Sequence, residues 1–313
     1  MMSTTTMLVT GACGYLGAHL IRQLAASPQA SSLRLRLLDN LSAGSVRSLM
    51  DLPSGPEYTF IEADLLSPGT MRAVLADVEI VAHLAAVVHT PFAFDQPSSV
   101  SQVNHWGTAH LLEQCREAGV RRFLHASSAS VYGPGEQFDE KAPCHPLGPY
   151  SCSKLEAEKA VLMANDKEFA TTVLRLATLY GGDPYLTRFT AIPNRFAYLA
   201  GTGRSLTVFG SGQQRRPLLH VRDAARAFLW AWEEKGSAGE VFNVVAENPT
   251  IESIALSLAD QCPGARVHYT DQDYREQLSL SISGERLRAA GFDPQERLED
   301  AMVSLLQHFP GLH

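Results

Sequence analysis

The sequence predicts an α/β protein built on a doubly wound parallel sheet, with a smaller C-terminal lobe. Short apolar segments alternate with helix-like stretches up to Leu176, which is the pattern of successive strand-helix-strand units. A glycine-rich turn follows the first apolar segment, at the entry to the first helix. The alternation ends after Leu179, where a turn-rich segment begins. We therefore expect a large first domain followed by a second, smaller one.

The expected elements of the first domain follow one another in a regular order. Met7 to Thr10 has the apolar character of a buried strand, and Leu16, Leu20 and Leu24 have the spacing of an apolar helix face. The remaining strands are expected at 33–38, 58–62, 80–84, 122–126 and 171–176, and the remaining helices at 71–76, 100–118 and 151–164.

The expected domain boundary lies where the alternation stops. We place the main domain at residues 1–177 and a substrate-binding lobe at 178–313, with a segment around 217–246 returning to the main domain. Beyond the boundary, strands are expected at 205–209 and 240–245, and helices at 223–232 and 251–259.

Composition and charge exclude several classes of protein. The chain has 313 residues and a net charge of -7, so it has no general attraction to nucleic acid. Its apolar stretches are far shorter than the ~20 residues that span a bilayer, and Met1 to Thr6 lacks the pattern of a signal peptide. None of the five cysteines forms a Cys-x-x-Cys pair. We expect a cytoplasmic protein without a metal ion, a disulfide framework, or a membrane or nucleic-acid partner.

Three glycines predict a dinucleotide-binding turn of the Rossmann type. Gly11, Gly14 and Gly17 lie in the stretch Thr-Gly-Ala-Cys-Gly-Tyr-Leu-Gly, between the first strand and its helix. The first glycine permits a tight turn, the second lets the backbone approach a pyrophosphate, and the third allows close packing of helix on sheet. Tyr15 and Leu16 belong to the same expected cofactor site.

The ends of the next strands supply further cofactor-binding candidates. Asp39 follows Gly17 by about 20 residues, at the position where a carboxylate accepts the adenosine ribose hydroxyls. This carboxylate would repel a 2′-phosphate, and the next residue is Asn40 rather than an arginine, so NAD is favoured over NADP. The other strand-end candidates are Asp64 and Leu65 after the third strand, and Leu84, Ala85 and Ala86 after the fourth.

A Tyr-x-x-x-Lys pair predicts the chemical site. Tyr150 and Lys154 are four residues apart, so a helix places both on one face. The pKa of a free tyrosine is about 10, and a lysine ammonium beside it favours the phenolate, which can then act as a base near neutral pH. Lys154 can also hold the nicotinamide ribose. Ser128, at the end of the fifth strand, is expected to hydrogen-bond the substrate oxygen that gains or loses the proton.

These motifs resemble those of the extended short-chain dehydrogenases/reductases of the nucleotide-sugar epimerase/dehydratase group. The resemblance covers nearly the whole chain. The segments that carry it are 10–17, 38–41, 64–65, 83–86, 103–108, 127–133, Tyr150 with Lys154, Arg216, and 220–223. It implies that NAD contacts Gly11, Gly14, Gly17, Asp39, Asn40, Asp64, Leu65, Ala85, Asn104 and Lys154.

The resemblance also implies roles for the substrate side of the site. Ser128 and Tyr150 would be catalytic and would contact the substrate, and Arg216 would meet its nucleotide diphosphate. Thr178 stands where members often have an asparagine that holds the substrate, and Ser281 stands where an acidic residue is common. These two departures leave the sugar and the nucleotide open. The helices at 100–118 and 151–164 would form a homodimer.

The expected reaction is epimerisation of a nucleotide-linked sugar at C4 through a transient 4-keto intermediate. Resembling dehydratases carry an acidic pair just after the catalytic hydroxyl residue, whereas this chain has Ala129 and Ser130, which are poor proton donors and acceptors. Neither a 4,6-dehydratase nor a decarboxylase is therefore expected. The alternatives are a nucleotide-sugar ketoreductase or dehydrogenase on the same scaffold, and a non-catalytic NAD-sensing regulator.

Overall fold

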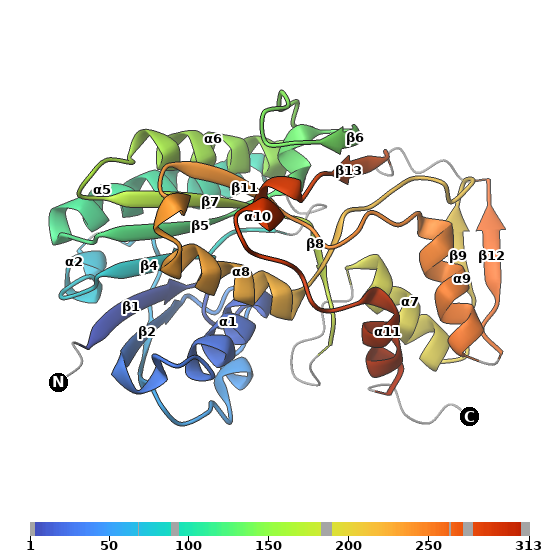
Figure 1. Cartoon of the computed structure of the whole chain (residues 1–313), viewed down its shortest axis with the longest axis horizontal. Helices are drawn as coiled ribbons and strands as arrows, with labels where there is room; N and C mark the ends of the chain where they lie inside the picture. The colour runs from blue at the N-terminus through green and yellow to red at the C-terminus, as the bar shows by residue number, and fades with distance from the viewer. Residues whose placement is uncertain are drawn as a thin grey trace. The chain divides into compact units, whose positions relative to one another are not determined.

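The computed structural model describes residues 4–67, 69–88, 94–182, 190–262, 264–271 and 278–307 (Figure 1). The chain divides into two compact units. The first unit consists of Met1–Gly133, Cys144–Arg175 and Ala225–Phe242, and the second of Pro134–Pro143, Leu176–Ala224 and Asn243–His313.

A seven-stranded parallel sheet forms the centre of the first unit and confirms the predicted fold class. The strand order is β11-β7-β5-β4-β1-β2-β3, so the chain winds outward from β1 in both directions. Met7 of β1 pairs with Leu35 of β2 on one side and with Ile80 of β4 on the other. The strands are β1 (Thr5–Thr10), β2 (Leu33–Asp39), β3 (Glu57–Glu62), β4 (Ile80–His83), β5 (Arg122–Ser128), β7 (Ala170–Leu176) and β11 (Glu240–Val244).

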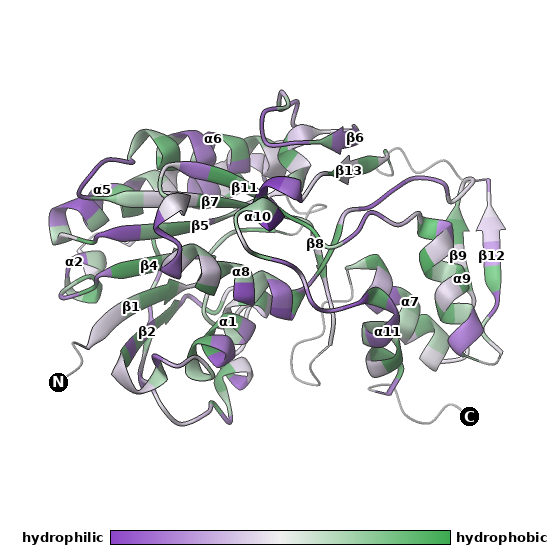
Figure 2. Ribbon diagram, in the orientation of Figure 1, coloured by the Kyte–Doolittle hydropathy of each residue, from purple (hydrophilic) through white to green (hydrophobic). Residues whose placement is uncertain are grey.

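Helices cover both faces of this sheet (Figure 1). Helices α5 (Gly107–Ala118) and α6 (Pro149–Met163) lie on one face with α2 (Thr70–Val74), because their apolar side chains share one core cluster with the strands. Helices α1 (Tyr15–Ala25) and α8 (Val221–Glu233) lie on the opposite face. The strands between these layers are largely apolar, as Figure 2 shows.

The helix expected at 100–118 has a more complex form. It begins with α4 (Pro97–Ser101), where Pro97 occupies the first turn and has no backbone N–H to satisfy. A π-helical stretch, η3 (Gln102–Trp106), then leads into α5. Such π-helical turns inside α-helices are frequent at functional sites. Apolar periodicity does not reveal this change of winding, because the residues continue around the same axis.

The second unit contains short strand pairs and a separate helical core. Three two-stranded pairs, β10-β8, β12-β9 and β13-β6, join segments that are far apart in the sequence. The core includes Phe196, Leu258 and Met302 from three different helices. The strands are β6 (Gly135–Phe138), β8 (Thr178–Tyr180), β9 (Leu206–Phe209), β10 (Leu218–His220), β12 (Val267–Thr270) and β13 (Leu280–Ile282), and the helices are α7 (Ile192–Gly201), α9 (Ile251–Gln261), α10 (Glu285–Ala289) and α11 (Leu298–Gln307).

The described residues offer neither a membrane-crossing helix nor a metal cluster. No helix in these parts of the chain combines the length and the apolar character needed to cross a bilayer. The same residues contain no group of three or more His, Cys, Asp or Glu side chains that could hold a metal ion.

Two buried histidines lie side by side on neighbouring strands of the sheet. The ring centroids of His83 and His125 are 5.5 Å apart. His83 is held on both sides, with Nδ1 2.8 Å from Thr10 Oγ1 and Nε2 2.9 Å from Thr108 Oγ1. Neither ring nitrogen of His125 has a hydrogen-bond partner among the described residues. Burial, with a smaller effect of Lys154, lowers the pKa of His83 to about 3 and the pKa of His125 well below its ordinary value.

Acid destabilisation should therefore depend on His125. Above pH 6.5 the ring is neutral in both states, so its contribution to stability is complete. Below pH 6.5 the imidazole of His125 takes up a proton in the unfolded chain but stays neutral in the folded chain. The free energy of unfolding therefore decreases as the pH decreases. His125→Phe should make this dependence shallower, by up to about 1.4 kcal/mol per pH unit, in urea denaturation down to about pH 4.

The matched control is His268→Gln. The side chain of His268 is exposed in the folded state, so the pH dependence of unfolding should not change. A His125→Phe variant whose slope equals that of the parent protein would contradict the prediction.

Candidate active site and cofactor site

The turn between β1 and α1 needs glycine at two of its three predicted positions. Gly11 has a φ of +69°, and a Cβ atom there would lie 2.8 Å from the backbone N of Ala85. A Cβ atom on Gly17 would lie 2.2 Å from the carbonyl O of Gly11. Both contacts are too short for any side chain, so the glycines let the turn pack closely against helix α1 and the segment after β4.

The N-terminus of α1 is suited to an anionic group. Gly14 is its N-cap in an extended conformation, and no side chain among the described residues caps it. The first helical residues are Tyr15 and Leu16, both predicted to belong to the cofactor site. An uncapped N-terminus of an 11-residue helix offers backbone N–H groups and the positive end of the helix dipole to a pyrophosphate.

Asp39 joins the end of β2 to this turn. Its Oδ2 accepts a hydrogen bond from the backbone N of Cys13 at 2.9 Å, and its Oδ1 accepts one from the backbone N of Leu41 at 2.8 Å. Each carboxylate oxygen can accept a further bond. Asp39 can therefore receive ribose hydroxyls while it remains anchored to the backbone.

The next two strand ends complete the edge of the predicted cofactor site. Asn40 Nδ2 donates to Asp64 Oδ2 at 2.7 Å, so the ends of β2 and β3 are tied together. The side chain of Leu65 is packed in the core of the first unit. Leu84, Ala85 and Ala86, which follow β4, are half-buried.

Asn104 lies in the π-helical stretch and is buried. Its Oδ1 accepts from the backbone N of Val87 at 2.8 Å, and its Nδ2 donates to the carbonyl O of Val87 and to Ser153 Oγ, each at 3.0 Å. The side chain thus clamps the segment after β4 to helix α6. Among the described residues, these contacts engage both ends of the amide.

The predicted catalytic residues come from the end of β5 and the start of α6. Gly148, with a φ of +83°, precedes Pro149 in the first turn of the helix, so Tyr150 is its second residue. Lys154 follows one turn later and is 3% exposed; its Nζ donates to the carbonyl O of Ala126 on β5 at 2.8 Å. Ser128 is the last residue of β5.

A small cavity lies between the 3-10 turn that follows β5 and the start of α6. Its volume is about 170 Å³, and Ser130 and Tyr150 both line it, together with Phe94 and Leu147. The Oγ atoms of Ser128 and Ser130 are 2.9 Å apart. Ser130 and Tyr150 thus line one cavity, and the hydroxyl of Ser128 is one hydrogen bond away from that lining.

Burial also affects the charge of Lys154, one helical turn after Tyr150. Burial lowers the pKa of Lys154 to about 8, and the negative charge of Glu158 opposes this change. At neutral pH the ammonium is still the main form, so it can favour the phenolate of Tyr150.

The sequence interpretation missed a buried polar network behind these residues. Glu158, four residues after Lys154, binds Arg175 of β7 and the hydroxyl of Ser127. Arg175 in turn binds the hydroxyl of Tyr132. The continuation of the four-residue spacing from Tyr150 through Lys154 was the signal that could have found Glu158.

The predicted substrate residues of the second unit also lie near one another. The backbone N of Thr178 donates to the carbonyl O of Pro217 at 2.9 Å, which places Thr178 beside the segment that carries Arg216. Arg216 is half-buried and donates to the carbonyl O atoms of Arg215 and Leu278. Ser281 is buried and accepts a hydrogen bond from the backbone N of Gln137, so its hydroxyl joins β13 to β6.

Comparison with known proteins identifies the family. The family model of the NAD dependent epimerase/dehydratase family matches residues 7–245. A dTDP-glucose 4,6-dehydratase of Streptomyces griseus is 30% identical over 311 residues, which are 96% of this chain and 93% of that protein.

Two solved structures extend this similarity to the fold. The dTDP-glucose 4,6-dehydratase from Streptomyces venezuelae, crystallised with NAD, has a TM-score of 0.85 and 26% identity, with 97% of each chain covered. The UDP-glucuronic acid 4-epimerase from Bacillus cereus, in complex with UDP-glucuronic acid and NAD, has a TM-score of 0.86 and 25% identity, with 99% of this chain and 100% of that chain covered. The glycine turn and Asp39 fit the dinucleotide that these structures hold. The chain therefore belongs to the NAD-dependent epimerase/dehydratase family, and NAD is its cofactor.

Proposed function

We propose that this protein is an epimerase that inverts C4 of a nucleotide-linked sugar. The observation that carries the proposal is the set of side chains around the cavity beside Tyr150. Ser130 lines this cavity, and Ala129 is buried next to it. No carboxylate is present among the described residues that line the cavity. These residues can exchange a proton with a sugar hydroxyl, but they offer no acid to expel the C6 oxygen.

The names of the similar proteins include both 4,6-dehydratases and 4-epimerases. The Streptomyces griseus protein is named a 4,6-dehydratase, whereas the Bacillus cereus structure is a 4-epimerase. Both kinds of enzyme share this fold, so similarity at 25–30% identity does not decide between them. A 4,6-dehydratase is therefore the second candidate, and it would need an acid-base pair other than residues 129 and 130.

The proposed chemistry assigns one task to each residue. The phenolate of Tyr150 takes the proton of the C4 hydroxyl, and the ammonium of Lys154 stabilises that phenolate. Ser128 hydrogen-bonds the same sugar oxygen while the carbonyl forms. NAD, held by the glycine turn and Asp39, would supply a reversible acceptor for the C4 hydride. When the 4-keto sugar has turned over in the site, the returned hydride reaches its other face, and Tyr150 gives the proton back.

The proposal also includes the substrate-binding residues, the oligomeric state and the location that the sequence predicts. Arg216 would meet the nucleotide diphosphate of the substrate, and Thr178 is a further candidate for substrate binding. The homodimer and the cytoplasmic location expected from the sequence belong to this proposal as well.

Asp39 should impose a preference for NAD over NADP. The carboxylate, already anchored by Cys13 and Leu41, would face the 2′-phosphate of NADP and repel it. Asp39→Asn removes the charge and keeps one acceptor oxygen, so the ratio of the two dissociation constants should narrow in calorimetric titrations. The control Glu57→Gln removes an exposed acid of the neighbouring strand and should leave the ratio unchanged. NADP binding as tight as NAD binding in the parent protein would contradict this assignment.

Tyr150→Phe should lower turnover by about a hundredfold to ten-thousandfold, because the essential proton acceptor is lost. NAD binding and the unfolding midpoint should stay close to those of the parent protein. The control Tyr58→Phe also removes one tyrosine hydroxyl, which binds the carbonyl O of Pro53 away from the site, and should keep full activity. Full turnover by Tyr150→Phe would reject the mechanism.

Incubation in deuterium oxide should separate epimerisation from dehydration. A panel of UDP-, dTDP-, GDP- and CDP-sugars is incubated with the enzyme, and the products are resolved by NMR. An epimerase of this type returns the same hydride, so the C4 epimer should carry no carbon-bound deuterium. Deuterium at C5 or C6, or a 4-keto-6-deoxy product, would establish the dehydratase instead. A net requirement for added reduced cofactor would indicate a ketoreductase.

A further inference from the structure

The face of α6 that carries the catalytic pair continues to a buried carboxylate. Tyr150, Lys154 and Glu158 are spaced by four residues, and Glu158 is 1% exposed. The hydroxyl of Ser127 on β5 donates to Glu158 Oε1. Arg175 binds the same carboxylate through Nε, 3.1 Å from each oxygen, and through Nη2, 2.7 Å from Oε2. This carboxylate thus links three elements of the first unit: α6, β5 and β7.

Arg175, the ion-pair partner of Glu158, also contacts the chain segment that follows Ser128. Arg175 Nη1 donates to the hydroxyl of Tyr132 at 2.8 Å, and its guanidinium carbon lies 4.8 Å from the centre of the Tyr132 ring. Tyr132 ends the 3-10 helix η4 (Ala129–Tyr132), which begins directly after Ser128. Ser127 and Tyr132 flank the segment that carries Ser128, and both are therefore anchored to the ion pair between Glu158 and Arg175.

Helix α6 is attached to the same strand end one turn earlier. Lys154 binds the carbonyl O of Ala126, and Ser127 binds Glu158, so two successive residues of β5 meet two successive turns of α6. The next residue along the strand is Ser128, and the preceding turn of the helix carries Tyr150. These two contacts therefore fix the position of the strand end that carries Ser128 relative to the helical turn that carries Tyr150.

We propose that Glu158 and Arg175 are positioning residues that hold Ser128, Tyr150 and Lys154 in their reactive arrangement. This inference rests on the catalytic roles proposed above. Neither residue lines the cavity beside Tyr150, so they act through the residues that they hold.

The charges around Lys154 give the ion pair a second effect. Among the described residues, the titratable groups that interact electrostatically with Lys154 are His83 from β4, His125 from β5 and Glu158 from its own helix, and Tyr150 lies one helical turn before it. Both histidines are neutral near pH 7 because burial lowers the pKa of each. Glu158 is the anion of this group, so it supports the ammonium that Tyr150 needs.

A purely structural ion pair would behave differently from a positioning pair. Replacing a buried ion pair by apolar side chains of similar volume is often neutral or stabilising, because no charge is left unpaired. The double variant Glu158→Met/Arg175→Met should therefore fold. If the pair only stabilises the fold, this variant should also keep the properties of the site.

The main measurement is the titration of Tyr150, which needs no substrate. Phenolate absorbance is followed against pH, and subtracting the curve of the matching Tyr150→Phe protein isolates this residue among the nine tyrosines. In the double variant the pKa of Tyr150 should rise by about one unit, because the nearby ammonium is less well held. On whichever sugar nucleotide is turned over, kcat should fall about 10- to 100-fold with little change in KM.

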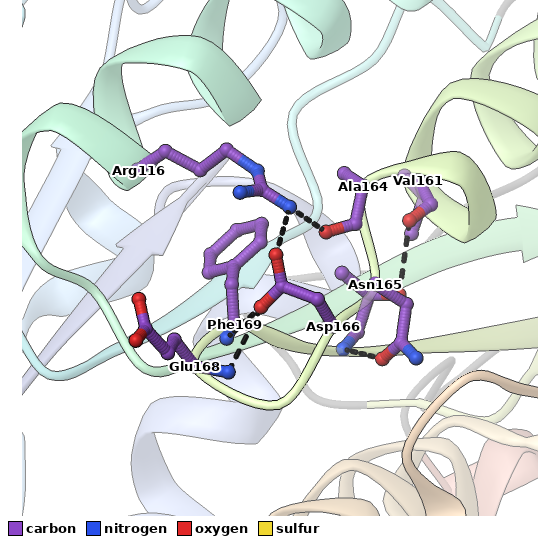
Figure 3. Close-up of polar contacts among 8 residues, drawn as sticks. Arg116, Val161, Ala164, Asn165, Asp166, Glu168 and Phe169 are labelled. Atoms are coloured by element: carbon purple, nitrogen blue, oxygen red, sulfur yellow. Dashed lines mark hydrogen bonds and ion pairs between the residues drawn. The ribbon is translucent and has the colours of Figure 1, made fainter.

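An ion pair at the other end of the same helix provides the control (Figure 3). Arg116 of α5 binds Asp166 at 2.6 Å and the carbonyl O of Ala164 at 2.5 Å, just beyond the last turn of α6. The control Arg116→Met/Asp166→Asn removes this pair and keeps the oxygen of residue 166 that accepts backbone N–H groups. Its Tyr150 titration and kcat should match those of the parent protein.

A second variant keeps the inference testable if the double variant fails to fold. Ser127→Ala removes the contact between β5 and Glu158 and leaves the ion pair intact, so both readouts should change in the same direction but less. The proposal would be overturned if the double variant folds and the titration of Tyr150 is unchanged. If the double variant does not fold, the same result in a folded Ser127→Ala variant would overturn it. If no sugar nucleotide is turned over, the proposed function fails, while the Tyr150 titration still decides this inference.

Discussion

The contact between the buried ammonium of Lys154 and the backbone of β5 is the interaction on which the site depends. An ammonium that is 3% exposed has lost most of its hydration, so hydrogen bonds and a nearby anion must compensate for that loss. The carbonyl O of Ala126 supplies the first and Glu158 the second. The helix that carries Tyr150 and the strand that carries Ser128 are thereby joined at the point where the chemistry is proposed.

The cofactor side of the first unit arises from a different constraint, the close approach of backbone to backbone. Gly11 and Gly17 leave no room for a side chain, because the turn after β1 packs directly on helix α1 and on the segment after β4. Asp39 then links the end of β2 to this turn through the N–H of Cys13. The result is an uncapped helix N-terminus beside a carboxylate, which suits the pyrophosphate and the ribose of NAD.

The proposed 4-epimerase and the second candidate, a 4,6-dehydratase, would share the first half of the reaction. Removal of a proton and a hydride from C4 needs a base, a hydroxyl and NAD, and the end of β5 with the start of α6 can supply the first two. The second half-reaction depends on the acids next to the 4-keto intermediate. In this chain the two residues after Ser128 are alanine and serine, and the carboxylate of Glu158 is buried in an ion pair with Arg175. On the proposed mechanism, the described residues that line the cavity beside Tyr150 provide no carboxylic acid for proton transfer to the C6 oxygen.

Local patterns were sufficient for the fold class and for most of the first unit. Short apolar runs between helical periods identified the inner strands such as β1, β4 and β7, because a strand buried on both faces is nearly continuously apolar. The glycine turn and Asp39 were recognisable because the dinucleotide requires these residue types at this spacing. The short strand pairs of the second unit have too few residues to show a period, and the paired residues of β6 and β13 are more than 140 positions apart.

The sequence by itself determined the fold class, the cofactor and the candidate chemical residues, since each depends on residue type and short-range spacing. Only the tertiary structure decided which polar side chains are buried together. Glu158 and Arg175 are ordinary charged residues in the sequence, and Ser127 and Tyr132 are ordinary neighbours of Ser128. Their burial in one network depends on how α6 and β7 pack against β5, and that packing is a contact between segments distant along the chain, which no local pattern encodes.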